Sequence, residues 1–324
     1  MVRLVLPLFV LALFGCGKSI QYAAGKEDEV FVVTDPSTWR DVEEPLRMAL
    51  ERKVPIVHPE QIFSLVRTDP DEFARFRARK NLLIVSRIRG QRSSALIQEL
   101  LPPSSLESAE EGSRIFFLEN PYREGQLAIV IVAATNESLR ETVQMSSDAL
   151  FQTLWDGAKK RIKERTLLNL NSSLTNRFVK EYGWLLRVPL QYKLTRKEEH
   201  MVRLTRHYPD RLISVHWKDG EDLRQEQCLE RREWFGRVFL DGDTILTDMT
   251  KVTDVEVNGI RATRIDGVWQ NKEHVMGGAF ITLCIYDQNR KRDYLIDGLV
   301  FAPGRKKWIY LAELEGIVES FKFE

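Results

Sequence analysis

GAFITLCIYDQNRKRDYLIDGLVF, residues 278–301, consists of two apolar runs on either side of a polar, charged segment. Both runs are rich in β-branched and aromatic residues, so we predict strands over 278–286 and 293–301 with a hairpin between them. Two further predicted strands, 252–257 and 260–269, extend the pattern to an antiparallel meander. Pro303-Gly304 then turns the chain into a final helix over 307–322. A sheet packed on a terminal helix is an α+β arrangement.

The residues before the meander predict a second layered unit. Strands are predicted over 29–34, 61–67, 81–88, 114–119 and 126–134. Helices are predicted over 35–52, 69–76 and 136–165. Asp35-Pro36 and Asp69-Pro70 supply a capping carboxylate and a first-turn proline to the first two of these helices. The segment PPSSLESAEEGS (102–113) is predicted to be a loop because of its composition.

We place the joint between the two units in the polar segment 168–176. Beyond it, helices are predicted over 174–182 and 223–239. Short strands are predicted over 184–187 and on through VPLQYKL (188–194), 201–207 and 211–217. The predicted fold class is therefore α+β with two sheet-plus-helix halves. An N-terminal α/β half occupies 29–167. A C-terminal α+β half occupies 168–324 and consists of an antiparallel meander closed by a C-terminal helix.

The composition bears on nucleic-acid binding and on disulfide formation. The chain has 324 residues, of which 48 are Lys or Arg and 47 are Asp or Glu, so the formal net charge is only +1. A chain this neutral is not expected to bind nucleic acid by electrostatic attraction. There are three cysteines, Cys16, Cys228 and Cys284. For Cys228 and Cys284 we favour two buried, small hydrophobic side chains, with a disulfide as the alternative.

The N-terminus has the pattern of an export signal. Arg3 precedes an apolar run, LVLPLFVLALF (4–14), which is too short to cross a bilayer as a helix. The run ends in Leu13-Phe14-Gly15-Cys16, which resembles the bacterial lipobox. That resemblance implies a signal peptide over 1–15, acyl chains on Cys16 and a tether over 16–28. An ordinary secretory signal, or a buried Cys16 in a helix, is the alternative.

Motifs for catalysis, phosphate binding and metal binding are absent from the sequence, so we predict no catalytic residue, no metal site and no cofactor. Arg290-Lys291-Arg292 and Arg305-Lys306-Lys307 are basic clusters that could meet anionic lipid headgroups, although solvated hairpin ends are the favoured interpretation. In RIDGVWQNKEHVMGGAF (264–280), glycines interrupt a strand pattern. Trp269, Gly277 and Gly278 are therefore candidate ligand-binding residues. A tight hairpin with Trp269 in the core is the alternative.

Several motifs along nearly the whole chain resemble one protein family. They are AAGKEDEVFVVTD (23–35), ARKNLLIV (78–85), WLLRVPLQYKL (184–194), RIDGVWQ (264–270), MGGAF (276–280) and DGLVFAPGRKKW (297–308). The chain resembles the Bacteroidota-type envelope lipoproteins grouped as domain of unknown function 4837. This resemblance implies export and lipid anchoring, and it implies no activity. The last ~150 residues also resemble the Mog1-type α+β sandwich, whose closing helix ends in a Ser-Phe pair (here Ser320-Phe321) and whose members are mostly binding or assembly factors.

We therefore expect a lipid-anchored bacterial envelope protein, with the outer membrane favoured over the inner one and the folded part in the periplasm or at the surface. Its expected partners are the membrane, through acyl chains on Cys16, and another envelope component that it binds or helps to assemble without catalysis. One alternative is a small-ligand binder with a cleft near Trp269 and Gly277. Another is a hydrolase whose site forms only in space.

Overall fold

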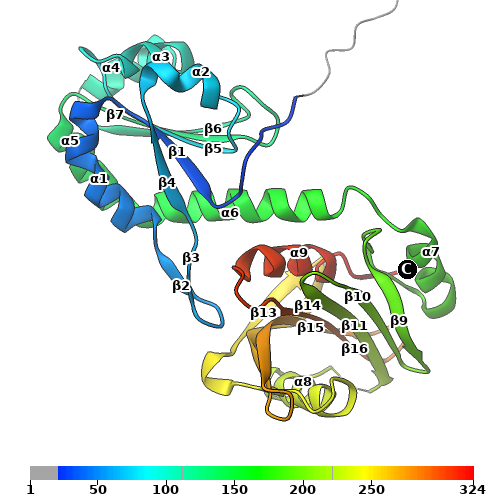
Figure 1. Cartoon of the computed structure of the whole chain (residues 1–324). Coiled ribbons are helices and arrows are strands. Elements are labelled where there is room, and N and C mark those ends of the chain that lie inside the picture. Colours follow the sequence, from blue (N-terminus) through cyan, green and yellow to red (C-terminus); the bar gives the residue numbers. More distant parts are fainter. Residues whose placement is uncertain (1–20, 111, 221) are drawn as a thin grey trace, which may run out of the picture.

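The computed structural model describes residues 21–110, 112–220 and 222–324. Cys16 and the predicted signal peptide lie outside these residues. The described chain folds into two layered parts that meet along two helices, α6 (Ser147–Thr166) and α9 (Trp308–Val318) (Figure 1). Strands and helices alternate in the first part, and the second part is an antiparallel sheet with a closing helix. The predicted α+β class is therefore confirmed.

The first part is built on a sheet with the strand order β4–β1–β5–β7–β6. Its strands are β1 (Glu29–Val33), β4 (Ser64–Thr68), β5 (Asn81–Arg87), β6 (Arg114–Glu119) and β7 (Leu127–Ala133). β1 pairs in parallel with β4 and β5, and β5 pairs in parallel with β7, whereas β6 is antiparallel to β7. β5 and β7 are almost continuously apolar because helices cover both faces of this sheet.

The two faces of this sheet carry different helices. Val30 and Val32 of β1 pack in a core with α1 (Pro36–Leu50), α5 (Asn136–Met145) and α6. Phe31 and Val33 point to the opposite core, which contains side chains of α2 (Phe73–Phe76), α3 (Ser93–Leu100) and α4 (Pro103–Glu110). A 3-10 turn, Pro70–Glu72, precedes α2. This alternation follows from the two-residue period of a strand.

Three sequence predictions for this part are wrong in detail. The predicted loop over 102–113 contains α4, because Ala109 packs beneath the sheet and Pro103 is tolerated in a first helical turn. The single helix predicted over 136–165 is interrupted at Ser146, where ψ is 13°, and forms α5 and α6. The strand predicted over 61–67 begins later, because a hairpin of β2 (Lys53–Pro55) and β3 (Pro59–Gln61) precedes β4.

The second part is built on an antiparallel sheet with the order β12–β14–β15–β16–β11–β10–β9, and β13 also pairs with β14. Its strands are β9 (Lys193–Glu198), β10 (Met201–Arg206), β11 (Asp210–Asp219), β12 (Thr244–Ile245), β13 (Lys251–Val257), β14 (Ile260–Asn271), β15 (Met276–Asp287) and β16 (Arg292–Phe301). A 3-10 turn, Thr247–Met249, leads into β13. The hairpin predicted within 278–301 is the β15–β16 pair at the centre of the sheet, with Thr282 opposite Asp297.

Helices cover both faces of the second sheet as well. α8 (Gln225–Phe239) packs on one face, over Phe280 and Leu295. α7 (Ser172–Tyr182) and α9 pack on the other face, over Ile281 and Ile296. The final helix is shorter than the predicted 307–322, because after Val318 the chain forms β17 (Lys322–Phe323), which pairs with β8 (Trp184–Leu185).

Helix α9 belongs to two cores at once. Its residues Trp308 and Ala312 pack in the core of the first part, whereas its Leu314, Ile317 and Val318 pack on the second sheet. Glycines allow close approach on both sides. A Cβ on Gly316 would lie 3.1 Å from the Cα of Lys163 in α6. A Cβ on Gly298 of β16 would lie 3.3 Å from the Cβ of Leu314.

We expect Gly316→Val to lower the free energy of unfolding by about 1–3 kcal/mol, because the new side chain meets the backbone of α6 and forces the two helices apart. Gly157→Val is the matched control, since it also replaces a helical glycine but meets the end of a flexible side chain, Leu127. Urea denaturation measures both changes. Equal losses for the two variants would contradict the close packing of α6 against α9.

Candidate functional site

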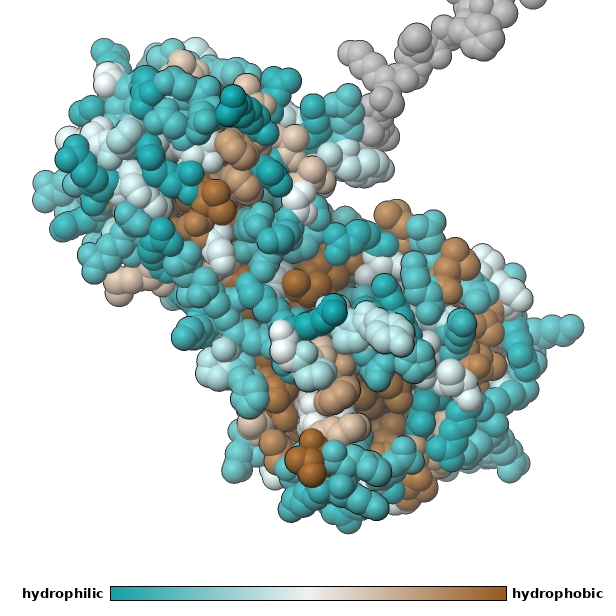
Figure 2. Space-filling view, viewed as in Figure 1, coloured by the Kyte–Doolittle hydropathy of each residue, from teal (hydrophilic) through white to brown (hydrophobic). Residues whose placement is uncertain are grey.

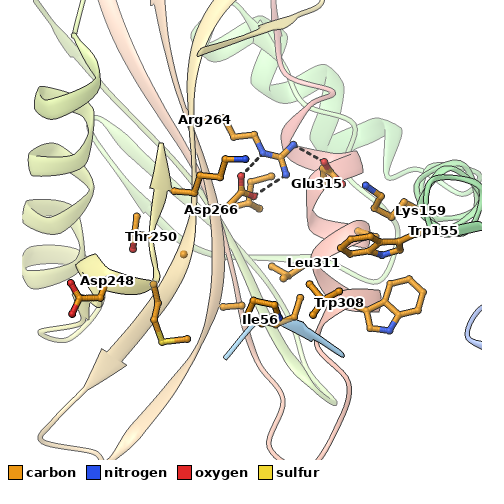
Figure 3. Close-up of a pocket in the computed structure, with 18 residues that line it drawn as sticks. Ile56, Trp155, Lys159, Asp248, Thr250, Arg264, Asp266, Trp308, Leu311 and Glu315 are labelled. Atoms are coloured by element: carbon orange, nitrogen blue, oxygen red, sulfur yellow. Dashed lines mark hydrogen bonds and ion pairs between the residues drawn. The ribbon is translucent and has the colours of Figure 1, made fainter. Parts of the chain in front are cut away.

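A cavity of about 640 Å³ lies where the two parts of the molecule meet. One wall comes from the first part: Ile56, at the turn of the β2–β3 hairpin, and Trp155 and Lys159 of α6. The opposite wall is part of one face of the second sheet, from β13, β14 and β15. Helix α9 forms the third side, through Trp308 and three further residues, Leu311, Ala312 and Glu315 (Figure 3).

The interior of the cavity is mostly apolar. Ala279 and Ile281 of β15 form part of the sheet wall, and Ile56 and Leu311 face them from the hairpin and from α9. Apolar residues are also visible in brown where the two parts meet in the space-filling view (Figure 2). An apolar cavity with a few polar groups is typical of a binding site.

Charged side chains form a network at one end of the cavity. Arg264 of β14 donates to both carboxylate oxygens of Asp266, over 2.7 and 2.8 Å, and to Glu315 of α9 over 2.6 Å. It also donates to Glu319 over 3.2 Å. Lys163 of α6 lies 3.2 Å from Glu315 and 2.8 Å from Glu319. The network therefore links α6, α9 and the second sheet beside the cavity. Figure 3 shows the contacts of Arg264 with Asp266 and Glu315.

The pKa shifts in this network favour its charged form. Burial of Arg264 opposes its charge, but hydrogen bonds and attraction from Asp266 and Glu315 outweigh burial and raise its pKa. Burial likewise opposes the charge of Glu315, and Arg264 and Lys163 nevertheless hold its pKa below its usual value. Both groups are therefore ionised at neutral pH, and they neutralise one another instead of presenting a free acid or base to a substrate.

The three candidate ligand-binding residues are not part of this cavity's lining. Trp269 is 2% exposed and packs under α8, on the opposite face of the sheet from Ala279 and Ile281. Gly278 lies opposite Trp269 in the β14–β15 pair, and a Cβ on it would lie 1.9 Å from the carbonyl oxygen of Val300. A Cβ on Gly277 would lie 2.9 Å from the carbonyl oxygen of Trp269. Close strand packing accounts for both glycines.

A second charged cluster lies beneath α8. Arg232 donates to Asp297 over 2.6 Å, Thr282 donates to the same carboxylate over 2.6 Å, and Arg231 pairs with Asp293. His216 lies 3.0 Å from Arg231, and burial, aided by the Arg231 charge, lowers its pKa to about 3. The four charged residues and His216 are each at most 6% exposed, so a substrate does not reach them. Their role is to bind α8 to the sheet.

Removal of one member of this cluster is expected to lower the free energy of unfolding. Asp297→Ala leaves the guanidinium of Arg232 buried and unpaired, so we expect a loss of roughly 3–5 kcal/mol in the free energy of unfolding. Asp219→Ala, which removes the exposed partner of Arg292, is the control, with an expected loss of at most about 1 kcal/mol. Chemical denaturation measures both, and similar small losses would mean that α8 does not depend on the Arg232–Asp297 pair.

Cys228 and Cys284 are both free and buried. The prediction of two small hydrophobic side chains is therefore confirmed for these residues. Within the described residues, no group of three or more His, Cys, Asp or Glu side chains is placed to hold a metal ion. Over the same part of the chain, no helix has both the length and the apolar character that a membrane crossing requires.

The residues that form the cavity were not predicted from the sequence. Ile56, Trp155, Arg264 and Trp308 come from four elements that are far apart along the chain. One local signal exists: Arg264 and Asp266 are two residues apart on a strand and therefore share a face. That spacing indicates a charged pair, but only the tertiary structure brings Glu315 and Lys163 to it.

Comparisons with known proteins give two family matches. Domain of unknown function (DUF8532) matches residues 23–166, and Domain of unknown function (DUF4837) matches residues 171–320. No curated protein matches the chain.

Three solved structures resemble parts of this chain only weakly. A Bacteroides thetaiotaomicron crystal structure has 8% identity and a TM-score of 0.29, and the match covers 44% of this chain and 45% of that one. This chain therefore spans less than half of the Bacteroides protein. The Saccharomyces cerevisiae Ran-binding protein Mog1p has 11% identity and a TM-score of 0.32, over 44% of this chain and 90% of that one. A Pseudomonas aeruginosa protein of unknown function, PA94, has 15% identity and a TM-score of 0.23, over 36% and 76%.

Proposed function

Because the chain belongs to the DUF4837 family through residues 171–320, a family whose description assigns no activity, we propose a binding role for it. In this proposal the protein is a bacterial envelope lipoprotein that is held to a membrane by acyl chains on Cys16. Its folded part binds another envelope component without catalysis. The lipobox-like Leu13-Phe14-Gly15-Cys16 at the end of an apolar run supports the anchor.

The cavity between the two parts is the observation that supports the binding role. Its volume of about 640 Å³ lies within the usual range of about 300–1,000 Å³ for ligand sites. Trp155 and Trp308 supply large apolar surfaces, and Ile56, Ile281 and Leu311 supply aliphatic ones. Burial of an apolar group against such side chains is favourable at roughly 25 cal/mol per Å² removed from water.

The charges at the cavity point to the chemistry of its occupant. Arg264 is paired with Asp266 and Glu315, and Lys159 lies 3.0 Å from Asp156 and 5.0 Å from the centre of the Trp155 ring. Charges that are already paired give little additional attraction to an anion or a cation. The two remaining charged lining residues, Asp248 and Lys251, are exposed and of opposite sign. The cavity therefore fits an aliphatic or aromatic group of the bound component, with polar contacts at its rim.

The anchor is tested by the intact mass of membrane-extracted protein from a bacterial host. We expect the mass of residues 16–324 plus acyl chains. Cys16→Ser removes the acceptor thiol, so this variant should carry no acyl chain and should be released from the membrane fraction by a high-salt wash. An unacylated wild-type protein would contradict the anchor and leave the cavity proposal standing.

The cavity is tested with a neutral apolar fluorophore, N-phenyl-1-naphthylamine, on residues 16–324 carrying Cys16→Ser, which retain every described residue. We expect saturable fluorescence enhancement. Met249→Glu should weaken binding at least about threefold, because Met249 lines the cavity and the new charge has to be desolvated when the apolar probe binds.

Met145→Glu is the matched control. Met145 is 88% exposed on α5 and Met249 is 39% exposed, so neither change is expected to unfold the protein. The Met145 variant should bind the probe like the wild type. Absence of saturable binding, or equal weakening by both variants, would rule out the cavity as the apolar binding site.

A further inference from the structure

A second recess lies on the opposite side of α9 from the cavity. It consists of two adjoining hollows of about 470 and 630 Å³, which share Arg165 of α6 and Ile309 and Tyr310 of α9. Residues 308, 311, 312 and 315 of α9 line the cavity, whereas residues 309, 310 and 313 line this recess. At 100° per residue these two sets lie on opposite faces of the helix. We call the recess the basic groove.

Basic side chains outnumber acidic ones in the basic groove, seven to three. Glu27 is shared by three cations: Lys80 at 2.5 Å, Arg165 at 2.9 Å and Arg161 at 3.0 Å. Because one carboxylate neutralises only one of these charges, an excess of positive charge remains around it.

The far end of the basic groove repeats this imbalance. Glu313 is shared by Arg211 at 2.7 Å and Arg206 at 3.1 Å.

Arg305 is exposed and lines the groove beside residues 25–28, and its side chain has no ion-pair partner among the described residues. Of the cluster Arg305-Lys306-Lys307, Arg305 and Lys306 line the groove, and Lys306 is paired with Asp28 and Lys307 with Glu60. Arg290 and Arg292 of the other basic cluster are paired with Asp287 and Asp219.

One exposed apolar side chain lines one end of the basic groove, and two more belong to residues that directly precede lining residues in the chain. Tyr208 lines it and is 94% exposed. Leu168 and Leu190 are 71% and 59% exposed, and the two segments are joined where the Leu190 amide donates to the carbonyl of Asn169, another lining residue. Basic groups beside exposed leucine and tyrosine are the combination that interfacial membrane binding uses. The cations attract anionic headgroups and the apolar groups enter the interface.

The chain itself brings this surface near the proposed anchor. Gly25, Lys26, Glu27 and Asp28 line the groove, and this segment runs beside α6 (Figure 1). Gly25 is only nine residue steps along the chain from Cys16. Fully extended, they span at most about 30 Å. A membrane that held acyl chains on Cys16 would therefore lie within reach of the groove.

We infer that the basic groove, with its rim of Leu168, Leu190 and Tyr208, binds the anionic phospholipid headgroups of the anchoring membrane. This inference rests on the proposed function, because the nearby membrane is the one reached through Cys16. The acyl chains provide attachment, and the groove provides orientation. With this face on the membrane, α9 lies behind it and the cavity opens on the far side of α9.

The test uses residues 16–324 carrying Cys16→Ser, so that acyl chains do not mask weak binding. Co-sedimentation is measured with vesicles of pure phosphatidylcholine and with vesicles containing about one-third phosphatidylglycerol. We expect binding to the anionic vesicles only, and we expect it to weaken as salt is raised. Arg165→Ser combined with Arg305→Ser should weaken it about twenty-five-fold, at roughly fivefold per charge. Leu168→Ser combined with Tyr208→Ser should also weaken it.

Arg237→Ser combined with Lys291→Ser is the control for loss of charge. Arg237 is exposed on α8, which covers the opposite face of the second sheet, and Lys291 is exposed in the β15–β16 turn. This pair should bind like the wild type. Thermal unfolding of every variant establishes that the exposed substitutions leave the fold intact.

Three outcomes would overturn the inference. They are equal binding to both kinds of vesicle, equal weakening by the control pair, and displacement by millimolar inorganic phosphate at constant ionic strength. The last outcome would instead assign the groove to free phosphate. None of these outcomes depends on acylation. A groove that does not bind anionic lipid is therefore distinguishable from a Cys16 that is not acylated, which the intact mass reports.

Discussion

The packing of α9 between two cores is the constraint on which the rest of the structure depends. An ordinary surface helix buries one stripe and exposes the other. In α9, Trp308 and Ala312 contact the first core, and Leu314, Ile317 and Val318 contact the second sheet. Such a helix is stable only with apolar neighbours on both sides, because either part alone would leave one of these surfaces in water. α9 therefore fixes the position of one half of the molecule relative to the other.

Recesses lie along two sides of α9, and their chemistry differs. The cavity beside Trp308 is apolar, with paired charges at one end, whereas the groove beside Tyr310 has an excess of cations. A single rigid helix thus separates a surface suited to an apolar partner from a surface suited to anionic headgroups. In the proposed function, one helix sets the geometry between the bound component and the membrane.

Buried ion pairs in the second part have a structural role that could be mistaken for catalysis. Arg232, Asp297 and Thr282 form a hydrogen-bonded group, and a buried histidine with a lowered pKa lies close by. Strongly shifted groups often mark active sites. Here the burial that lowers the pKa of His216 also excludes a substrate, so the cluster positions α8 on the sheet.

The sequence alone determined the central hairpin within 278–301, most strands of the first sheet and the α+β class, because periodicity and turn residues are local signals. It misassigned 102–113, where Ala109 gains burial only against a distant sheet. The sequence made Trp269 a candidate ligand-binding residue, but the surroundings of Trp269 depend on where α8 packs. The cavity and the basic groove join residues as far apart as Ile56 and Glu315, or Glu27 and Arg165. Residues so far apart in the sequence are brought together only by the folded chain, so the tertiary structure alone decided these contacts.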